Sequence, residues 1–323
     1  FQVQVLENRI GLDVNYYFRK TENDILFPPI SQAAGYSAGP RNLGLITNQG
    51  WEISLTGTPF DKKDFSWDVS FNYSYNKSRI VELAEGIDVL TLGNAIGGPT
   101  MINAVGLPYS TVRAYVMKRN ADGVLVYNKA TGYEDRELKD LGVGNPPYLM
   151  GINNNFRYKR FHLTVDLDSK FGAVGYSNLI QYATRFGLTP ITLPGRENGL
   201  TVSGVDQSGE PYSKLWEVVN LDTYYNNFGS AYPGQFVYST DFVKLRRMVL
   251  RYDLPVNVAR FLKVESASVA LTGLNLLTIY QDKRVKDAGI DPEMQQTVGN
   301  AQGSQGVAMP VTRNFGFNLH LVF

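Results

Sequence analysis

The feature that most constrains this chain is a strict alternation of apolar and polar residues, which recurs in separate stretches. NFGFNLHLVF (314–323) places Phe or Leu at every second position, and FSWDVSFNYSYN (65–76) places apolar residues there in the same way. A period of two puts successive side chains on opposite faces of a β-strand. Each such stretch is therefore predicted to form a strand with one apolar face and one polar face.

The same pattern along the whole chain predicts nine strands. They are the segments 1–6, 9–19, 51–57, 65–76, 148–158, 161–171, 241–255, 264–280 and 314–323. In the segment 241–255 the alternation breaks at Arg246 and Arg247. A β-bulge at this point would restore the register of the strand.

The connections between these strands alternate in length. Short connections are expected at 7–8, 59–64, 159–160 and 254–263, and long ones at 23–44, 81–146, 177–235 and 281–310. Short turns at one end and long extracellular loops at the other are typical of bacterial outer-membrane barrels. A soluble β-sandwich also alternates along its strands, but it seldom sorts its loops by length. The sequence therefore predicts an all-β fold, a transmembrane antiparallel β-barrel.

Composition excludes several other classes of protein. There is no Cys, so thiol catalysis, thiolate metal sites and disulfides are excluded. The formal net charge is +1, and no nucleic-acid partner is expected from so even a balance. No run of 18 or more apolar residues occurs, so no transmembrane helix is predicted.

Nine strands are not expected to be the whole barrel. Bacterial single-chain barrels normally have an even number of strands, and an unpaired strand edge in lipid leaves backbone groups unsatisfied. The chain starts at Phe1, and no signal peptide is recognisable before the first strand. We therefore expect a longer polypeptide, of which residues 1–323 are the C-terminal portion of the barrel.

Several stretches of the chain resemble the SusC-like TonB-dependent transporters of Bacteroidetes outer membranes. They are NRIGLDVNYYFRKTENDIL (8–26), NQGWEISLTGTP (48–59), GLPYSTVRAY (106–115), GNPPYLMGINNNFRYKRFHLTVDLDSKFG (144–172), DFVKLRRMVLRYDLP (241–255), LTGLNLLTIYQD (271–282), DPE (291–293) and the terminal strand. They are spread over nearly the whole chain in the family's order. The resemblance implies a 22-stranded barrel, the size of plugged outer-membrane transporters. This chain would be its last nine strands, with the plug domain and the N-terminal barrel strands outside it.

The resemblance also implies a function and its partners. A SusC-like protein is an outer-membrane nutrient importer that works with a SusD-like surface lipoprotein as a lid and with TonB, which contacts the N-terminal part. By the frequency of substrates in the family, an oligosaccharide is expected first and an oligopeptide second. The segment NADGVL (120–125) departs from an Asp/Asn-Gly-Asp-Gly stretch that family members often carry, and no metal site is predicted there. A passive porin and a transport-inactive barrel that serves as a scaffold remain alternatives.

No catalytic motif is recognisable, so neither an enzyme nor a cofactor is predicted. HExxH and GxGxxG patterns are absent from the sequence, and no GxSxG stretch stands in the strand-to-helix setting of a nucleophile elbow. His162 and His320 lie on the polar faces of predicted strands and are expected to line the barrel. Asp287, Asp291 and Glu293 supply hard oxygen ligands, but their spacing matches no calcium loop, and we predict a solvated acidic loop.

The loop 177–235 is rich in aromatic residues, and some of them are candidate substrate contacts. The candidates are Tyr212, Trp216, Tyr224, Tyr225 and Tyr232. Aromatic faces stack on sugar rings and also contact peptide side chains. A loop of this length also needs packing of its own, so the same residues can instead form its core. The sequence leaves both interpretations open.

The apolar row of the last strand resembles the C-terminal signal that the barrel-assembly machinery reads. This row consists of Phe315, Phe317, Leu319, Leu321 and Phe323. After insertion the same side chains are expected to face outer-membrane lipid, with Phe323 near the interface, where aromatic residues are enriched.

Overall fold

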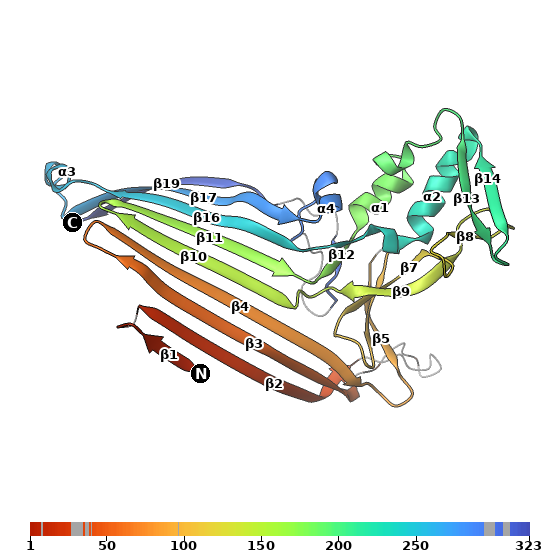
Figure 1. Ribbon diagram of the computed structural model, residues 1–323, viewed down its shortest axis with the longest axis horizontal. Coiled ribbons are helices and arrows are strands. Elements are labelled where there is room, and N and C mark those ends of the chain that lie inside the picture. The colour runs from red at the N-terminus through yellow and green to blue at the C-terminus, as the bar shows by residue number, and fades with distance from the viewer. Residues whose placement is uncertain are drawn as a thin grey trace.

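The nine predicted segments form one continuous antiparallel sheet (Figure 1). The computed structural model describes residues 1–7, 9–26, 35, 39, 41–95, 97–293, 301–305 and 311–323. The sheet order follows the chain: β1 (Gln2–Val5), β2 (Ile10–Leu26), β3 (Arg41–Asp61), β4 (Phe65–Glu82), β10 (Tyr148–Tyr158), β11 (Phe161–Phe171), β16 (Phe242–Asp253), β17 (Ser266–Gln281) and β19 (Asn314–Val322). The predicted bulge is confirmed, because Arg246 has no partner in the pairing of β16 with either neighbouring strand.

Two strands are longer than the alternating pattern predicts. β2 continues beyond Arg19 to Leu26, and β3 begins at Arg41, well before Trp51. The two strands stay paired over this whole extension. The alternation does not extend over these residues, but a strand needs only paired backbone groups and not an apolar face. The apolar-polar pattern therefore underestimates the length of both strands. The connection between β2 and β3 is correspondingly shorter than expected.

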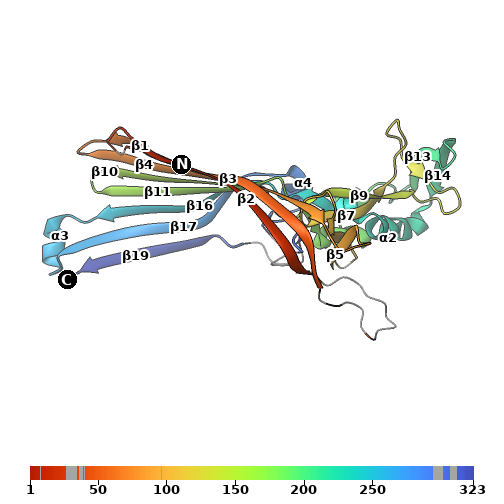
Figure 2. The same ribbon diagram turned by 90° about the horizontal axis from the view of Figure 1, so that it is seen from below.

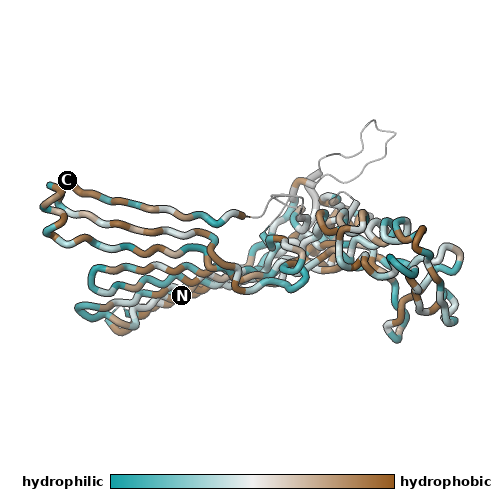
Figure 3. The backbone as a smooth tube through the Cα atoms, turned by 90° about the horizontal axis from the view of Figure 1, so that it is seen from above, coloured by the Kyte–Doolittle hydropathy of each residue, from teal (hydrophilic) through white to brown (hydrophobic). Residues whose placement is uncertain are grey.

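One face of the sheet is apolar and the other is polar. Paired positions form rows across the strands, for example the apolar row Leu12, Leu55, Phe71, Ile152 and Leu167 beside the polar row Asp13, Ser54, Asn72, Gly151 and Asp168. Figure 3 shows the resulting change of hydropathy along each strand. Large apolar side chains remain exposed on the apolar face, with 60% of Phe18, 60% of Leu271 and 66% of Phe317 accessible. A face of this kind is suited to contact with lipid.

Short and long connections leave opposite ends of the sheet. The short ones are 6–9, 62–64, 159–160 and 254–265, and the long ones are 27–40, 83–147, 172–241 and 282–313. In Figures 1 and 2 the short connections lie at the end that holds the C-terminus and the helix α3 (Val256–Phe261). The length alternation read from the sequence is thus an alternation between two ends of one sheet.

The described residues of 83–147, 172–241 and 282–305 fold together, and we call them the loop domain. Its strands form three small sheets: β5 (Val89–Asn94), β6 (Thr100–Ala104), β7 (Thr111–Met117) and β9 (Arg136–Val143); β8 (Val126–Tyr127), β13 (Leu200–Asp206) and β14 (Pro211–Trp216); and β12 (Val174–Ser177), β15 (Val237–Ser239) and β18 (Ser304–Gln305). Its helices are α1 (Asn178–Arg185), η2 (Pro190–Thr192), η3 (Val218–Asn220), α2 (Leu221–Ala231), η4 (Pro233–Phe236) and α4 (Lys283–Asp287). The helices among the described residues are too short or too polar to span a lipid bilayer.

The chain is mostly β-strand, as predicted, and its short helices lie chiefly in the loop domain. The helix α1 begins where the side chain of Ser177 accepts a hydrogen bond from the backbone N–H of Ile180, 3.4 Å away, as an N-cap residue does. Its buried positions, Gln181 and Thr184, face the rest of the loop domain. A helix this short is marginal in isolation and forms here because of its tertiary packing, which local sequence patterns do not reveal.

Three of the four long connections, 83–147, 172–241 and the described part of 282–313, share one hydrophobic core. Its buried residues come from all three: Ala95, Met101 and Val112 from the first, Tyr176, Phe228, Tyr232, Phe236, Val237 and Tyr238 from the second, and Val285 and Ile290 from the third. The third connection also pairs with the second, since the backbone N–H of Tyr176 donates to the carbonyl of Gly303 at 2.8 Å. A Cβ atom at Gly144 would lie 1.9 Å from the carbonyl oxygen of Gln302, so only glycine fits beside this segment.

Candidate functional site

The candidate substrate residues lie mainly inside the loop domain. Trp216, Tyr224 and Tyr225 are buried in a second cluster, and Tyr232 is 1% exposed in the core described above. Tyr212 is half-buried and stacks on Tyr127, with ring centroids 5.3 Å apart. Of the two interpretations left open by the sequence, this arrangement corresponds to a core of the loop itself. Their contact with a substrate remains a prediction.

A buried carboxylate ties two of these tyrosines to the connection 83–147. The hydroxyl of Tyr224 donates to Oε1 of Glu134 at 2.7 Å, and that of Tyr232 donates to the backbone carbonyl of Glu134 at 2.5 Å. Burial, and then the nearby charge of Glu134, raise the pKa of both phenols far above the usual value. Both hydroxyls therefore stay protonated as donors. Sequence reasoning missed Glu134, because no local pattern marks an acid that pairs across about 90 residues.

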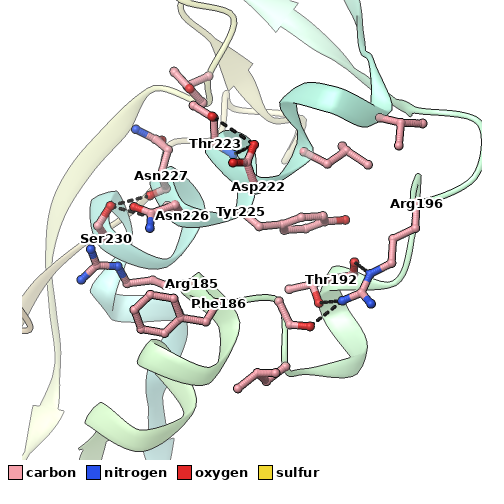
Figure 4. A pocket seen from close by; sticks show the side chains of 15 residues that line it. Arg185, Phe186, Thr192, Arg196, Asp222, Thr223, Tyr225, Asn226, Asn227 and Ser230 are labelled. Atoms are coloured by element: carbon pink, nitrogen blue, oxygen red, sulfur yellow. Dashed lines mark hydrogen bonds between the residues drawn. The ribbon is translucent and has the colours of Figure 1, made fainter.

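An open groove lies beside this cluster, between α1, η2 and α2 (Figure 4). Its volume is about 1120 Å³. Its polar lining includes Arg185, Arg196, Asp222, Thr192, Thr223, Asn226, Asn227 and Ser230, and its apolar lining Tyr133, Phe186, Leu188, Val218, Leu221 and Tyr225. Of the five sequence candidates, only Tyr225 is among the lining residues, and its hydroxyl donates to the carbonyl of Pro194 at 3.0 Å.

Local hydrogen bonds fix one wall of the groove. Nε of Arg196 donates to the carbonyl of Thr192 at 2.9 Å, and Nη2 donates to its hydroxyl at 2.9 Å. The same nitrogen also donates to the carbonyl of Gly187 at 2.5 Å. Arg196 thus holds the turn after α1 in place.

Exposed apolar side chains gather around the groove, although they lie far from the sheet. This apolar rim consists of three lining residues, Phe186 (66% exposed), Leu188 (77%) and Val218 (46%), and of three residues next to the lining in the chain, Ile191 (51%), Leu193 (59%) and Val219 (76%). Exposed patches of this kind on a folded domain mark sites of contact with another molecule. Aliphatic residues scattered through a loop give no periodic signal, and the sequence analysis did not select them.

Two of the three acidic residues singled out in the last long connection are not solvated, which corrects that part of the prediction made from sequence. Asp287 is exposed, but Oδ1 of Asp291 and Oε2 of Glu293 each lie 2.6 Å from Nζ of Lys244. Burial by itself would raise the pKa of Glu293, but hydrogen bonds from Arg246 and Lys244 outweigh it and lower the pKa. Among the described residues, no group of three or more metal-ligating side chains is present.

The histidines and the Asn120 segment have structural surroundings. Nε2 of His162 lies 2.8 Å from Oδ2 of Asp253, and His320 is exposed opposite Ser268 on the polar face. The side-chain oxygen of Asn120 accepts hydrogen bonds from two backbone N–H groups within its own turn. None of these arrangements joins a nucleophile to a base.

The row predicted to act as an assembly signal lies on β19. Phe315, Phe317 and Leu319 are exposed on the apolar face, and Leu321 packs against the small cluster of Ala259, Val264 and Ala267. The role of these residues, with Phe323, in assembly remains a prediction.

Comparisons with known proteins agree with this architecture. No protein-family profile matches the chain. It is 25% identical over 354 aligned residues to TonB-dependent receptor P3 of Formosa agariphila. This alignment covers 99% of this chain and 33% of that protein. It is 27% identical over 189 residues to TonB-dependent receptor SusC of Bacteroides thetaiotaomicron, with 54% and 19% covered.

Solved structures show the same fold. The RagAB peptide importer in the 'closed-closed' state matches with a TM-score of 0.71 at 20% identity, covering 99% of this chain and 34% of that one. The 'open-open' state of the same importer matches with a TM-score of 0.67. This chain thus spans about one third of the length of the proteins it matches.

Proposed function

Because this chain is a relative of the SusC-like TonB-dependent receptors of the outer membrane, we propose that it forms the C-terminal barrel portion of a TonB-dependent nutrient importer. The observation that carries the proposal is a two-faced nine-stranded sheet with a folded loop domain at one end only. In the complete barrel, the apolar face contacts lipid and the polar face lines the lumen. The plug, the remaining strands and the TonB contact belong to the part of the protein outside this chain.

The loop domain lies on the extracellular side and binds a surface lipoprotein of the SusD type. The apolar rim supports this part of the proposal, since six large apolar side chains are 46–77% exposed around one groove. A stable protein interface buries on the order of 800 Å² on each partner and has an apolar centre with a polar edge. The rim supplies the apolar centre, and the surrounding Arg, Asp and Asn side chains supply the polar edge.

An oligopeptide is favoured over an oligosaccharide as the substrate. Sugar rings bind by stacking on accessible aromatic faces, but Trp216 and Tyr224 are buried in the loop domain. The accessible residues around the groove are mainly aliphatic, and Arg185 and Arg196 are cations suited to carboxylates. The matched solved structures are of a peptide importer, which supports the same choice.

Growth on defined nutrients tests the transport proposal. A strain that lacks the full-length gene should lose growth on a set of purified oligopeptides as sole nutrient source, and a plasmid copy should restore it. The same loss should follow from inactivation of TonB. Growth that persists without TonB would identify a passive porin. Unimpaired growth on every peptide and glycan, combined with loss of another envelope complex, would identify a scaffold.

A point variant tests the docking surface separately. Leu188→Asp in the full-length protein should release the lipoprotein during co-purification, because a charge replaces a side chain that is 77% exposed on the rim. Val124→Asp is the matched control, since Val124 is also exposed in the loop domain but lies in the turn that Asn120 holds. Equal retention of the lipoprotein by both variants would contradict docking at the rim.

A further inference from the structure

The pairing of β16 with β17 is irregular near the loop domain. Arg246 of β16 is unpaired, and on the neighbouring strand Asn275 and Leu276 of β17 are skipped in the same pairing. Asn275 adopts a positive φ of 52°. Adjacent bulges, one of them with a left-handed backbone at a residue other than glycine, are uncommon and serve to re-aim side chains.

The side chains of Lys244 and Arg246, next to this irregularity, both contact the last long connection. Nζ of Lys244 lies 2.6 Å from Asp291 and 2.6 Å from Glu293, and the Lys244 side chain is only 3% exposed. Arg246 forms a two-pronged contact with Glu293, with Nη1 to Oε2 at 3.0 Å and Nη2 to Oε1 at 2.8 Å. The carboxylates of the connection are thus held by cations from the wall.

Arg246 also joins the neighbouring strands to this contact. Its Nη2 lies 2.5 Å from Oδ2 of Asp168 on β11, and its Nη1 donates to Oδ1 of Asn275 at 3.0 Å. Asn275 in turn donates to the carbonyl of Thr312, at the start of the last strand. The cluster therefore links β11, β16, β17 and both ends of the last connection.

The adjacent residue Arg247 provides a natural comparison. Its Nε lies 2.6 Å from Oδ2 of Asp166 on β11, and the structure gives it no contact with the described part of the last connection. Both arginines pair with an aspartate of β11, but of the two only Arg246 also contacts the described part of the last connection.

We propose that Lys244 and Arg246 form an ionic anchor, which fixes segment 282–293 to the polar face of the sheet and so holds the loop domain in one orientation over the lumen. Lys244 is buried with two carboxylates, and removal of one member of such a cluster leaves the others uncompensated. Apolar contacts of Val285 and Ile290 carry the anchor's effect into the shared core. The consequence for transport rests on the proposed function, whereas the anchoring itself does not.

Cysteine labelling of the full-length protein tests the anchor in intact cells. With any cysteine outside residues 1–323 replaced by serine, Ile290→Cys provides a single reporter, because Ile290 is 4% exposed and this chain has no cysteine. Its reaction with a membrane-impermeant maleimide should be slow, and adding Lys244→Met or Arg246→Gln should accelerate it by at least about tenfold. Adding Arg247→Gln should leave the rate within about twofold, since that pair does not involve the loop.

If Lys244→Met or Arg246→Gln impairs membrane insertion, variants in the last long connection provide the same test. Asp291→Asn with Glu293→Gln removes the same contacts from a connection that is not part of the barrel wall. This double variant should also accelerate labelling by about tenfold or more. An unchanged rate in an inserted protein, or equal acceleration by Arg247→Gln, would overturn the anchor.

Uptake separates the anchor from the proposed function. The double variant should import its peptide several times more slowly at saturating substrate, and Lys139→Gln, which breaks an exposed pair with Glu137, should not. Fast labelling with normal uptake would overturn the orienting role. Fast labelling in a protein whose unmodified form imports nothing would support the anchor and reject the transport function.

Discussion

The sheet and the loop domain place the same kinds of side chain in opposite positions. On the sheet, Phe317 is 66% exposed and Leu271 is 60% exposed, whereas in the loop domain Tyr176 and Tyr232 are at most 1% exposed. The sheet turns its apolar residues outward because its surroundings are lipid, and the loop domain turns them inward because its surroundings are water. One chain thus has one region suited to lipid and one suited to water. The boundary lies where the chain passes from the strands of the sheet into the long connections.

The two regions also satisfy their backbones differently. In the sheet, each strand pairs with its neighbours in long registers such as that between β10 and β11, from Tyr148↔Phe171 to Tyr158↔Phe161. The loop domain uses short strands, helices and side-chain acceptors such as Ser177 and Asp206. In lipid no water is available to pair backbone groups, so regular pairing is required there.

The largest expected effect concerns the two ends of the sheet. A cysteine at Lys129, whose side chain is 77% exposed in the loop domain, should react with an impermeant maleimide in intact cells. A cysteine at Lys63, in a short turn at the opposite end, should react only after the outer membrane is permeabilised. Labelling of Lys63→Cys alone in intact cells would reverse the orientation of the chain.

Truncation of a core aromatic should affect the loop domain strongly and the sheet hardly at all. Phe228→Ala should lower the local unfolding free energy of the loop domain by about 3–5 kcal/mol, since Phe228 is buried in the shared core. Hydrogen exchange should then rise throughout the loop domain while β10 and β11 stay protected. Phe186→Ala, at an exposed position of the rim, should change stability by less than about 0.5 kcal/mol.

Charge on the sheet should be costly on one face only. Val165→Arg should lower the unfolding free energy in lipid vesicles by about 2–4 kcal/mol, the range for arginine in the lipid-facing wall of a barrel. Thr164→Arg points to the polar face and should lose only the hydrogen bond to Asn155, or about 1 kcal/mol. Denaturant titration of both variants checks this, and equal losses would mean that the sheet does not have a lipid face.

Removal of the Tyr224 hydroxyl should weaken the contact between the connections 83–147 and 172–241. Tyr224→Phe leaves Oε1 of the buried Glu134 without its donor, and should lower the stability of the loop domain by about 1–3 kcal/mol. Hydrogen exchange around β8 and α2 reports the loss. The double variant with Glu134→Leu should recover part of it, and a larger loss in the double variant would contradict this account.

The smallest effect is a pH dependence of the anchor. The pKa of Glu293 is lower in the folded protein than its ordinary value of 4.5, so its ionised form stabilises the fold. That contribution is fully present above pH 4.5 and is lost as the pH falls through the lowered folded-state pKa. Exchange of segment 282–293, corrected for intrinsic rates, should accelerate over this range, and Glu293→Gln should abolish the step while leaving β4 unchanged.

Much of the sheet could be predicted because the alternation of apolar and polar residues is a property of neighbouring positions in the sequence. Alternation in 65–76 and 161–171 identifies strands directly, since lipid on one side requires an apolar residue at every second position. The break at Arg246 and Arg247 even marked the bulge. The extension of β2 to Leu26 was missed, because pairing outside lipid needs no alternation.

The candidate site could be predicted only in outline. Composition identified an aromatic connection that needs packing of its own, but it could not separate buried Trp216 from Tyr225, which also lines the groove. The rim around Leu188 and the pairing of Glu134 depend on how helices pack, which no short-range pattern encodes.

The sequence by itself determined that this chain makes a two-faced β-sheet with long connections at one end, because alternation and loop length are properties of neighbouring residues. Only the tertiary structure decided that three of these connections form one domain, and that Lys244 and Arg246 hold the last of them. The physical reason is distance along the chain. Lys244 and Glu293 are far apart in sequence, and their charges meet only after the strands have paired and the connection has folded back.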